Sequence, residues 1–407
     1  MPAERQVLER AIREGAPAAL AALLRSGPRF ADAEDAVQEA VLIALEVWPR
    51  TGVPDRPVGW FVRVAQRRLI ARHRSDTARV NREALAAAWS VPPPDPAASD
   101  DDSLALLFLC SHPDLTPTAA IPLTLRAVGG LTTREVASVL LANEATIGQR
   151  ISRAKAVIAR SGEPFARPSP DQIDARLPSV LQVIYLIFTG GHSAVGAADG
   201  PRVDAATRLD LSAEAIHLAR RLHDQLPDVP EAAGLLALLL LTDARRLART
   251  TADGELVPLD QQDRARWDRA MITEGVALLT DAFSHHRLGD YQLQAAIAAV
   301  HDQAPTSDRT DWPRLLALYD LLLRRNDSPI VELNRSIVVA HASGPEEALR
   351  ELEPLASRLA DHHRFHATLG YLHDLAGDRA AARIAYARAA GLAPNEPERR
   401  YLGRMAR

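Results

Sequence analysis

Residues 130–160 have the sequence GLTTREVASVLLANEATIGQRISRAKAVIAR, and the interpretation of the whole chain depends on this stretch. It predicts two short helices joined by a tight turn, with Thr133 capping the first and Asn143 capping the second. Apolar residues of the second helix recur at the spacing of one helix face: Ile147, Ile151, Ala154 and Ile158. The pattern predicts a packed back and a polar front, as a helix-turn-helix needs to enter a DNA major groove.

The polar front of the second helix carries the candidate DNA contacts. Gln149 and Arg153 are candidates for base recognition, because Gln can pair with adenine and Arg with guanine. Ser152 lies on the same face, and the candidates for phosphate contact are Thr132, Thr133, Arg150 and Lys155. Gly148 weakens the helix and removes a side chain from this surface, which leaves the base preference open. The alternative is an ordinary αα-hairpin with a solvated face.

Composition favours a soluble, helical protein of several domains. The chain has 407 residues, 47% hydrophobic and 25% charged, with only 4% aromatic residues. The net charge is −4, yet residues 1–85 contain 14 arginines against 11 acidic residues. Such a local positive charge is compatible with nucleic-acid binding by one part of the chain. Lys155 is the only lysine.

Several classes of site and location are disfavoured. The one cysteine, Cys110, excludes an internal disulfide and a thiolate metal cluster, and Cys110 with His112 supplies too few ligands for zinc. The N-terminus MPAERQVLER lacks the apolar core of a signal peptide, and the apolar run 233–241 is too short to span a bilayer. We therefore expect a cytoplasmic protein without membrane contact. No catalytic constellation is found, so neither an enzyme nor a cofactor is expected.

The first 85 residues predict three amphipathic helices, over about 4–25 (interrupted near 15–17), 32–48 and 57–74. Acidic residues gather in the first turn of the second helix, where the helix dipole favours them. The third helix has an apolar side and a row of cations along the other: Arg63, Arg67, Arg68, Arg72 and Arg74.

DAEDAVQEAVLIALEVW at 32–48 followed by WFVRVAQRRLIARHR at 60–74 resembles region 2 of the extracytoplasmic-function sigma factors of bacterial RNA polymerase. The hairpin at 130–160 lies where that family has region 4. The resemblance implies that Asp35, Gln38 and Glu39 contact the polymerase core, whose largest-subunit clamp and flap would be the partners. It further implies that the separated −10 promoter strand is bound by Trp60, Arg63, Arg67, Arg68 and Arg74. Region 4 would recognise the −35 element as duplex DNA.

The rest of the chain predicts linkers and a long helical extension. Residues 86–103, AAAWSVPPPDPAASDDDS, are a flexible linker, and 163–175 form a second one. The extension covers 176–330, and 331–407 resemble tetratricopeptide repeats, most clearly in FHATLGYLHDLAGDRAAARIAYARAAGLAPNEPE. This order of parts is similar to one group of extracytoplasmic-function sigma factors, in which the extension is thought to regulate the factor in cis.

The prediction is thus an all-α protein with region 2 at 1–85, region 4 at 104–162 and the helical extension after it. Its expected function is promoter-specific initiation with core polymerase and promoter DNA as partners. A regulatory protein or ligand on the C-terminal domain is left open. One alternative is a helix-turn-helix regulator with a repeat domain for sensing or interaction that does not replace a sigma factor. Another is a helical scaffold whose basic regions serve protein contacts only.

Overall fold

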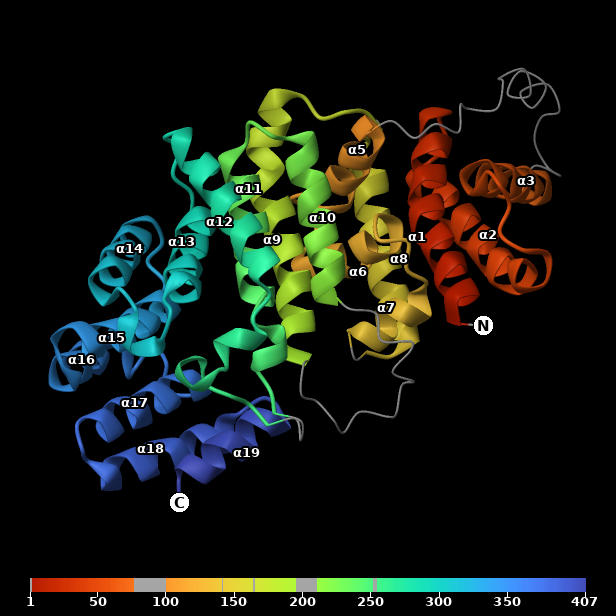
Figure 1. The fold of residues 1–407 in the computed structure, drawn as a ribbon. Coiled ribbons are helices and arrows are strands. Elements are labelled where there is room, and N and C mark those ends of the chain that lie inside the picture. The colour runs from red at the N-terminus through yellow and green to blue at the C-terminus, as the bar shows by residue number, and fades with distance from the viewer. Residues whose placement is uncertain (1, 77–99, 141, 164, 195–210, 252–254) are drawn as a thin grey trace. The chain divides into compact units, whose positions relative to one another are not determined.

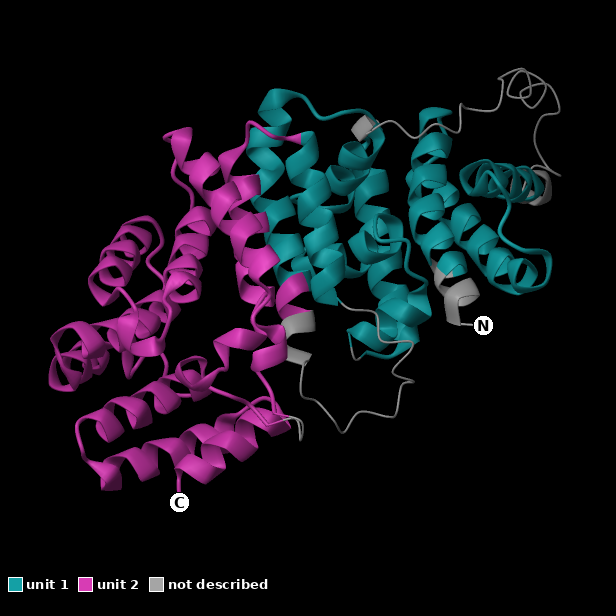
Figure 2. Cartoon of the chain, viewed as in Figure 1, with its two compact units in different colours: residues 1–187, 209–225 teal, residues 188–208, 226–407 magenta. Residues whose placement is uncertain are grey.

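The fold is all-α, as predicted, and divides into two compact units (Figures 1 and 2). Unit 1 comprises 1–187 and 209–225, and unit 2 comprises 188–208 and 226–407. Apart from helices and loops, the described residues contain one isolated antiparallel bridge, between Thr250 and Leu256. The computed structural model describes residues 2–76, 100–140, 142–163, 165–194, 211–251 and 255–407.

Unit 1 begins with a three-helix bundle of α1 (Pro2–Arg25), α2 (Phe30–Thr51) and α3 (Pro57–Asp76). The predicted interruption of the first helix at 15–17 is wrong, since α1 continues through Pro17. The helix continues because this segment is packed in the core. Gly15, Ala16 and Pro17 are all buried, and Gly15 packs on the ring of Phe61. This packing outweighs a cost of roughly 3 kcal/mol for proline inside a helix.

The hairpin is formed by α7 (Thr133–Val139) and α8 (Glu144–Ser161), which follow α5 (Asp100–Cys110) and α6 (Pro117–Ala127). Asn143 caps α8 as predicted, accepting a hydrogen bond of 2.8 Å from the Ala145 amide. The cap of α7 is Thr132 and not Thr133. Thr132 and Glu135 form a reciprocal capping box, which requires a carboxylate three residues after the cap. The apolar stripe of α8 is buried as predicted: Ile147, Ile151, Ala154 and Ile158.

The first two helices of the predicted extension, α9 (Pro170–Ala194, up to Ile187) and α10 (Leu211–Gln225), belong to unit 1. The compact units therefore cut across the boundary expected at 163–175. α10 packs on α5, where Arg221 donates a hydrogen bond to Ser103. Glu214 of α10 lies so close to Gly129 that a Cβ there would meet its carboxylate at 3.0 Å. Leucines at 104, 107, 218 and 222 line this contact.

One described helix segment, Pro170–Gly190 in α9, is long and apolar enough to cross a membrane. Its mean hydropathy of 1.2 is modest, and 44% of its most apolar stretch is buried inside the protein. A core helix of a soluble protein passes the same test, so this segment is weak evidence for a membrane span.

Unit 2 is a succession of helices in which each contacts its neighbours along the chain. Such an arrangement is typical of repeat proteins, whose stability comes from contacts between successive elements. The helices are α11 (Pro230–Asp243), α12 (Arg269–Ser284), α13 (Asp290–Gln303), α14 (Trp312–Arg325), α15 (Pro329–Ser343), α16 (Pro345–Leu352), α17 (His363–Leu375), α18 (Arg379–Leu392) and α19 (Glu396–Met405).

The pair α17 and α18, which the repeat-like sequence singled out, approaches most closely at Gly370. A Cβ at Gly370 would lie only 2.8–2.9 Å from three ring atoms of Tyr386. Gly377, with φ of +82°, makes the turn between the helices. Ala382 and Ala389 are buried on the same side of α18 as Tyr386. A glycine opposite a tyrosine ring thus sets the distance between the two helices.

Gly370→Ala should destabilise unit 2 by about 1–3 kcal/mol, because the added methyl group overlaps the Tyr386 ring. Gly391→Ala on α18 is the matched control, since a Cβ there meets nothing within 4 Å. It should be neutral or stabilise by up to about 1 kcal/mol. Urea denaturation followed by circular dichroism measures both. Equal midpoints for the two variants would contradict the close-approach argument.

Candidate functional site

The three acidic-helix residues predicted to contact polymerase lie on α2 in different surroundings. Asp35 and Glu39 are half-buried, whereas Gln38 is only 9% exposed. The Glu39 carboxylate lies 3.5 Å from the Arg68 guanidinium of α3. Asp35 forms ion pairs with residues of region 4. The three residues therefore lie on one helix, and two of them, Asp35 and Glu39, form ion pairs within the protein.

Three arginines of the basic surface predicted on α3 can be placed. Arg63, Arg67 and Arg68 are exposed along the helix. Trp60 is half-buried in an aromatic cluster, with its ring 5.1 Å from Trp48 and 5.4 Å from Phe61 between centroids. Part of the Trp60 side chain is therefore packed in the core. The side chains of Arg72 and Arg74 lie outside the described residues.

Most residues of the predicted DNA face of α8 are accessible to solvent. Gln149, Ser152 and Arg153 are exposed, and Arg150 is half-buried. The two threonines at the start of α7 have structural roles as well. The Thr132 hydroxyl accepts the Glu135 amide at 3.2 Å, and the Thr133 hydroxyl accepts a hydrogen bond from Arg126.

Lys155 differs from the other candidates because its side chain is buried and directed to α2. Its residue is 8% exposed, and its ammonium group pairs with Glu34 and, at 2.5 Å, with Asp35. Arg126 of α6 pairs with the same two carboxylates, at 3.8 Å from Asp35. We call these four residues the Lys155 cluster: Glu34, Asp35, Arg126 and Lys155. In this conformation Lys155 is not available to a DNA phosphate.

Glu34 and Arg126 were not predicted as site residues, although the sequence indicates that Glu34 is a buried acid. Glu34 lies in the apolar stripe of α2, three residues before Val37 and seven before Val41, and it is 0% exposed. An acidic residue in a buried stripe requires a cationic partner. The sequence does not say from which helix that partner comes.

Burial makes the cluster energetically important. A buried ion pair adds little net stability over apolar packing, but removing one partner costs about 3–5 kcal/mol, because an uncompensated charge is left behind. Exposed pairs such as Glu39 with Arg68 contribute about 0–1 kcal/mol. The contact between α2 and region 4 therefore depends on charge pairing at the Lys155 cluster far more than on the surface pairs.

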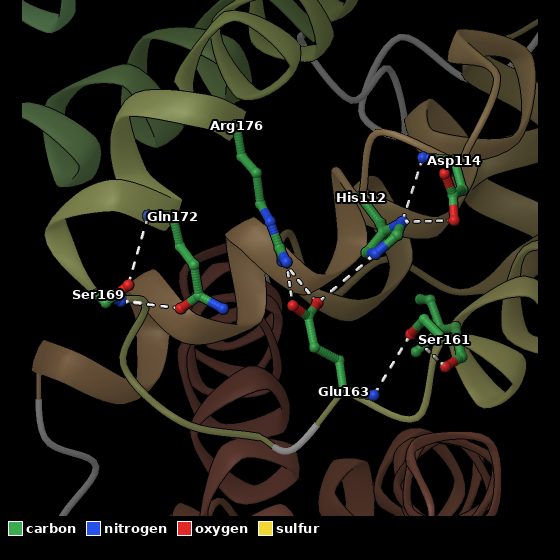
Figure 3. Close-up of polar contacts among 8 residues, drawn as sticks. His112, Asp114, Ser161, Glu163, Ser169, Gln172 and Arg176 are labelled. Atoms are coloured by element: carbon green, nitrogen blue, oxygen red, sulfur yellow. Dashed lines mark hydrogen bonds and ion pairs between the residues drawn. The ribbon is translucent and has the colours of Figure 1, made fainter.

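A second polar cluster lies between region 4 and α9, shown in Figure 3. The carboxylate of Glu163, just after α8, accepts two hydrogen bonds from Arg176 of α9. His112 lies on its other side, with Nε2 3.6 Å from a Glu163 oxygen. The hydrogen bonds from Arg176 hold the pKa of Glu163 below its usual range. This pairing is present above the ordinary pKa of glutamate and is lost as the pH falls through the lowered value.

Polar residues are dense at 260–268, and the structure gives several of them structural roles. Asp263 and Asp268 cap helices, and Arg264 donates hydrogen bonds to the carbonyls of His301 and Ala304 at the end of α13. Burial raises the pKa of the Cys110 thiol, which makes it unreactive. Among the described residues, no group of three or more His, Cys, Asp or Glu side chains is placed to hold a metal.

Comparison with known proteins agrees with this geometry. Residues 11–79 match sigma-70 region 2, and residues 106–158 match sigma-70, region 4. The chain belongs to the sigma-70 family. Residues 176–283 match a family of unknown function, DUF6596. The chain is also similar to the uncharacterized protein R00370 of Rhizobium meliloti (strain 1021), at 41% identity over 97% of this chain and 94% of that protein.

Membership in the sigma-70 family identifies the chain as a sigma factor, a transcription initiation factor and not an enzyme. Its partners are core RNA polymerase and promoter DNA. The α2–α3 bundle is region 2, and the α7–α8 hairpin lies in region 4, as the sequence pattern predicted.

Glu34→Gln should destabilise unit 1 by about 3 kcal/mol, because Arg126 and Lys155 are left with Asp35 alone. The matched control is Glu39→Gln on the same helix, which breaks the half-exposed pair with Arg68 and should cost less than about 1 kcal/mol. Urea denaturation with circular dichroism measures the difference. A Glu34→Gln midpoint equal to that of the control would show that the buried cluster carries no special stability.

Proposed function

We propose that this sigma-70 chain is an extracytoplasmic-function sigma factor that acts in the cytoplasm, with an extension that regulates it in cis. Region 2 would contact core polymerase through Asp35, Gln38 and Glu39 and capture the opened −10 strand. Region 4 would recognise the −35 duplex. The observation that carries the proposal is that two separate surfaces of exposed polar and basic side chains, on α3 and α8, occur in the domains that match regions 2 and 4.

The exposed arginines of α3 support the −10 part of the proposal. Arginines at 63 and 67 are one helical turn apart, and Arg68 lies beside them, so cations follow the helix as phosphates follow a strand. Trp60 is half-buried, so part of its side chain is accessible, and we propose that a base of the separated strand stacks on it. Arg74, in the last part of α3, is the remaining member of the proposed set.

The exposed face of α8 supports the −35 part. Gln149 and Arg153 are one turn apart and both exposed, which suits side chains that reach base edges from a recognition helix. Arg150, Ser152 and the two threonines before α7 are proposed to contact the backbone. Gly148 has open space around it, since a Cβ added there would meet no atom within 4 Å. A larger side chain at this position would therefore fit and could alter base preference.

The extension is proposed to regulate the factor through unit 1. Its first helices, α9 and α10, lie in the same compact unit as regions 2 and 4, and Arg176 of α9 holds Glu163 directly after α8. A conformational change that moves α9 would therefore also move Glu163, at the end of the recognition helix. We propose that the last helices, with Gly370 opposite Tyr386, are tetratricopeptide-like and bind the regulatory signal.

Run-off transcription with purified core polymerase tests the function, using Arg63→Ala/Arg67→Ala. The double variant should lose most initiation, by at least tenfold, because two cations that hold the separated −10 strand are removed. Binding of duplex −35 DNA should be unchanged, since α8 is intact. The matched control, Arg10→Ala/Arg50→Ala, removes two exposed arginines of region 2 outside the proposed surface.

The outcomes separate the functions. If the wild-type chain gives no promoter-specific initiation and does not bind core polymerase, the sigma factor function is wrong, and a duplex-binding regulator is the better description. Equal losses in both double variants would instead show that only total charge matters, which would contradict the −10 assignment.

Two truncations test the extension. A chain ending at Gln225 keeps α9 and α10 and should fold unit 1, whereas one ending at Glu163 exposes the leucines at 104 and 107 and should aggregate or melt early. Transcription by the longer truncation is the measurement of cis regulation. Activity within twofold of the full chain would contradict the regulatory role of unit 2.

A further inference from the structure

Three aromatic side chains from successive helices of unit 2 contact one another. Trp312, at the start of α14, stacks on His341 of α15, with ring centroids 3.9 Å apart and planes inclined by 8°. The Nε2 atom of His341 lies 2.9 Å from the hydroxyl oxygen of Tyr371 on α17. Trp312 and Tyr371 are half-buried, whereas His341 is exposed. We call these three residues the aromatic series; solvent reaches it at His341.

The carboxylate of Asp260 lies beside the aromatic series. Asp260 is in the short helix η3 (Leu259–Gln261), which contacts η5 (Ser307–Arg309) just before α14. Burial raises the pKa of Tyr371, and the negative charge of Asp260 raises it further. Burial lowers the pKa of His341, and Asp260 opposes this change. The charge of Asp260 therefore acts on two members of the series.

Asp260 has no structural role of the kind that its neighbours have. Asp263 and Asp268 in the same segment cap helices. The side chain of Asp260 is exposed, and within the described part of the chain its carboxylate forms no hydrogen bond or ion pair. Both of its oxygens are thus free to accept hydrogen bonds from a bound molecule.

A neighbouring set of residues shows which group suits such surroundings. Arg404 of α19 pairs with Glu255, and its guanidinium carbon lies 5.9 Å from the centroid of the Tyr401 ring. Burial and the charge of Asp260 raise the pKa of Tyr401, which places this set near Asp260. A guanidinium can donate two hydrogen bonds to a carboxylate while its flat face stacks on an aromatic ring. Asp260 and the aromatic series offer the same combination.

We propose that Asp260 and the aromatic series form a binding site for a guanidinium group, from an arginine side chain or a free guanidino compound. The proposal rests on the signal-binding role proposed above for the last helices and names the chemical class of the signal. The Asp260 carboxylate accepts hydrogen bonds from the edge of the guanidinium, and the rings contact its face. Because burial lowers the pKa of His341, this side chain is uncharged at pH 7.5 and does not repel the cation.

Ligand-observed NMR titration of the full-length chain at pH 7.5 tests the site, with N-acetylarginine methylamide and methylguanidine as probes. Both should bind with a Kd of about 1 mM or tighter. N-acetylcitrulline methylamide has nearly the same shape as the arginine derivative without the charge, and it should bind at least tenfold more weakly. At least fivefold tighter binding of the arginine derivative than of methylguanidine supports a peptide as the source. Equal binding of the two supports a free guanidino compound.

Two variants test the named residues. Asp260→Asn should weaken binding of the arginine derivative at least fivefold, and His341→Ala at least threefold, because the first removes the charge and the second a stacking surface. The matched control is Asp327→Asn, which removes an exposed carboxylate between α14 and α15. Asp327 lies at the opposite end of α14 from Trp312, about 20 Å away. This variant should bind the arginine derivative as the wild type does. All three positions are exposed, and circular dichroism checks that each variant is folded.

The guanidinium site is overturned if the citrulline derivative binds as tightly as the arginine derivative. It is also overturned if Asp260→Asn and Asp327→Asn bind the arginine derivative equally. Run-off transcription of the same preparation separates this result from the sigma factor function. A chain that initiates transcription and binds neither cation overturns the guanidinium site alone. A chain that binds both cations and does not initiate overturns the sigma factor function and supports the site.

Discussion

The arrangement of unit 1 depends on compensating the charge of Glu34. This carboxylate is fully buried in the apolar face of α2, where an unpaired charge would be strongly unfavourable. Its partners, Arg126 and Lys155, come from two helices of region 4, 92 and 121 residues further along the chain by their numbering. Region 2 therefore cannot bury its acidic helix in this way without region 4. Regions 2 and 4 therefore lie in one compact unit.

The first part of the extension strengthens this unit. α10 packs on α5, and Arg176 of α9 holds Glu163 at the end of the recognition helix. Within unit 1, region 4 therefore contacts region 2 on one helix and α9 and α10 on others. The match to DUF6596 begins at residue 176. Its first residue, Arg176, contacts Glu163, which directly follows the hairpin of region 4. This gives the proposed cis regulation a physical route within unit 1.

Sequence patterns predicted local features well, because those features depend on neighbouring residues. The stripe of α8 and its Asn143 cap were correct in detail. The cap of α7 was misplaced by one residue, because the threonine pair at 132–133 offers two similar hydroxyls, and only the distance to Glu135 distinguishes them. The break expected in α1 did not occur, since packing of Gly15 against Phe61 overrode the local preference of glycine and proline.

The sequence by itself determined that the protein is helical, where its hairpin lies, and that it resembles a sigma factor with a basic third helix. The helical class, the hairpin and the basic helix follow from periodicity, capping residues and charge along single helices, whereas the likeness to sigma factors rests on the resemblance of the motifs at 32–48 and 60–74. Only the tertiary structure decided that the lone lysine at the margin of the hairpin is buried against Glu34 and Asp35. A pairing across some 120 residues leaves no periodic trace in the sequence, because each partner alone resembles an ordinary surface charge. The hairpin of region 4 therefore also carries the residue that pairs with the buried acid of region 2.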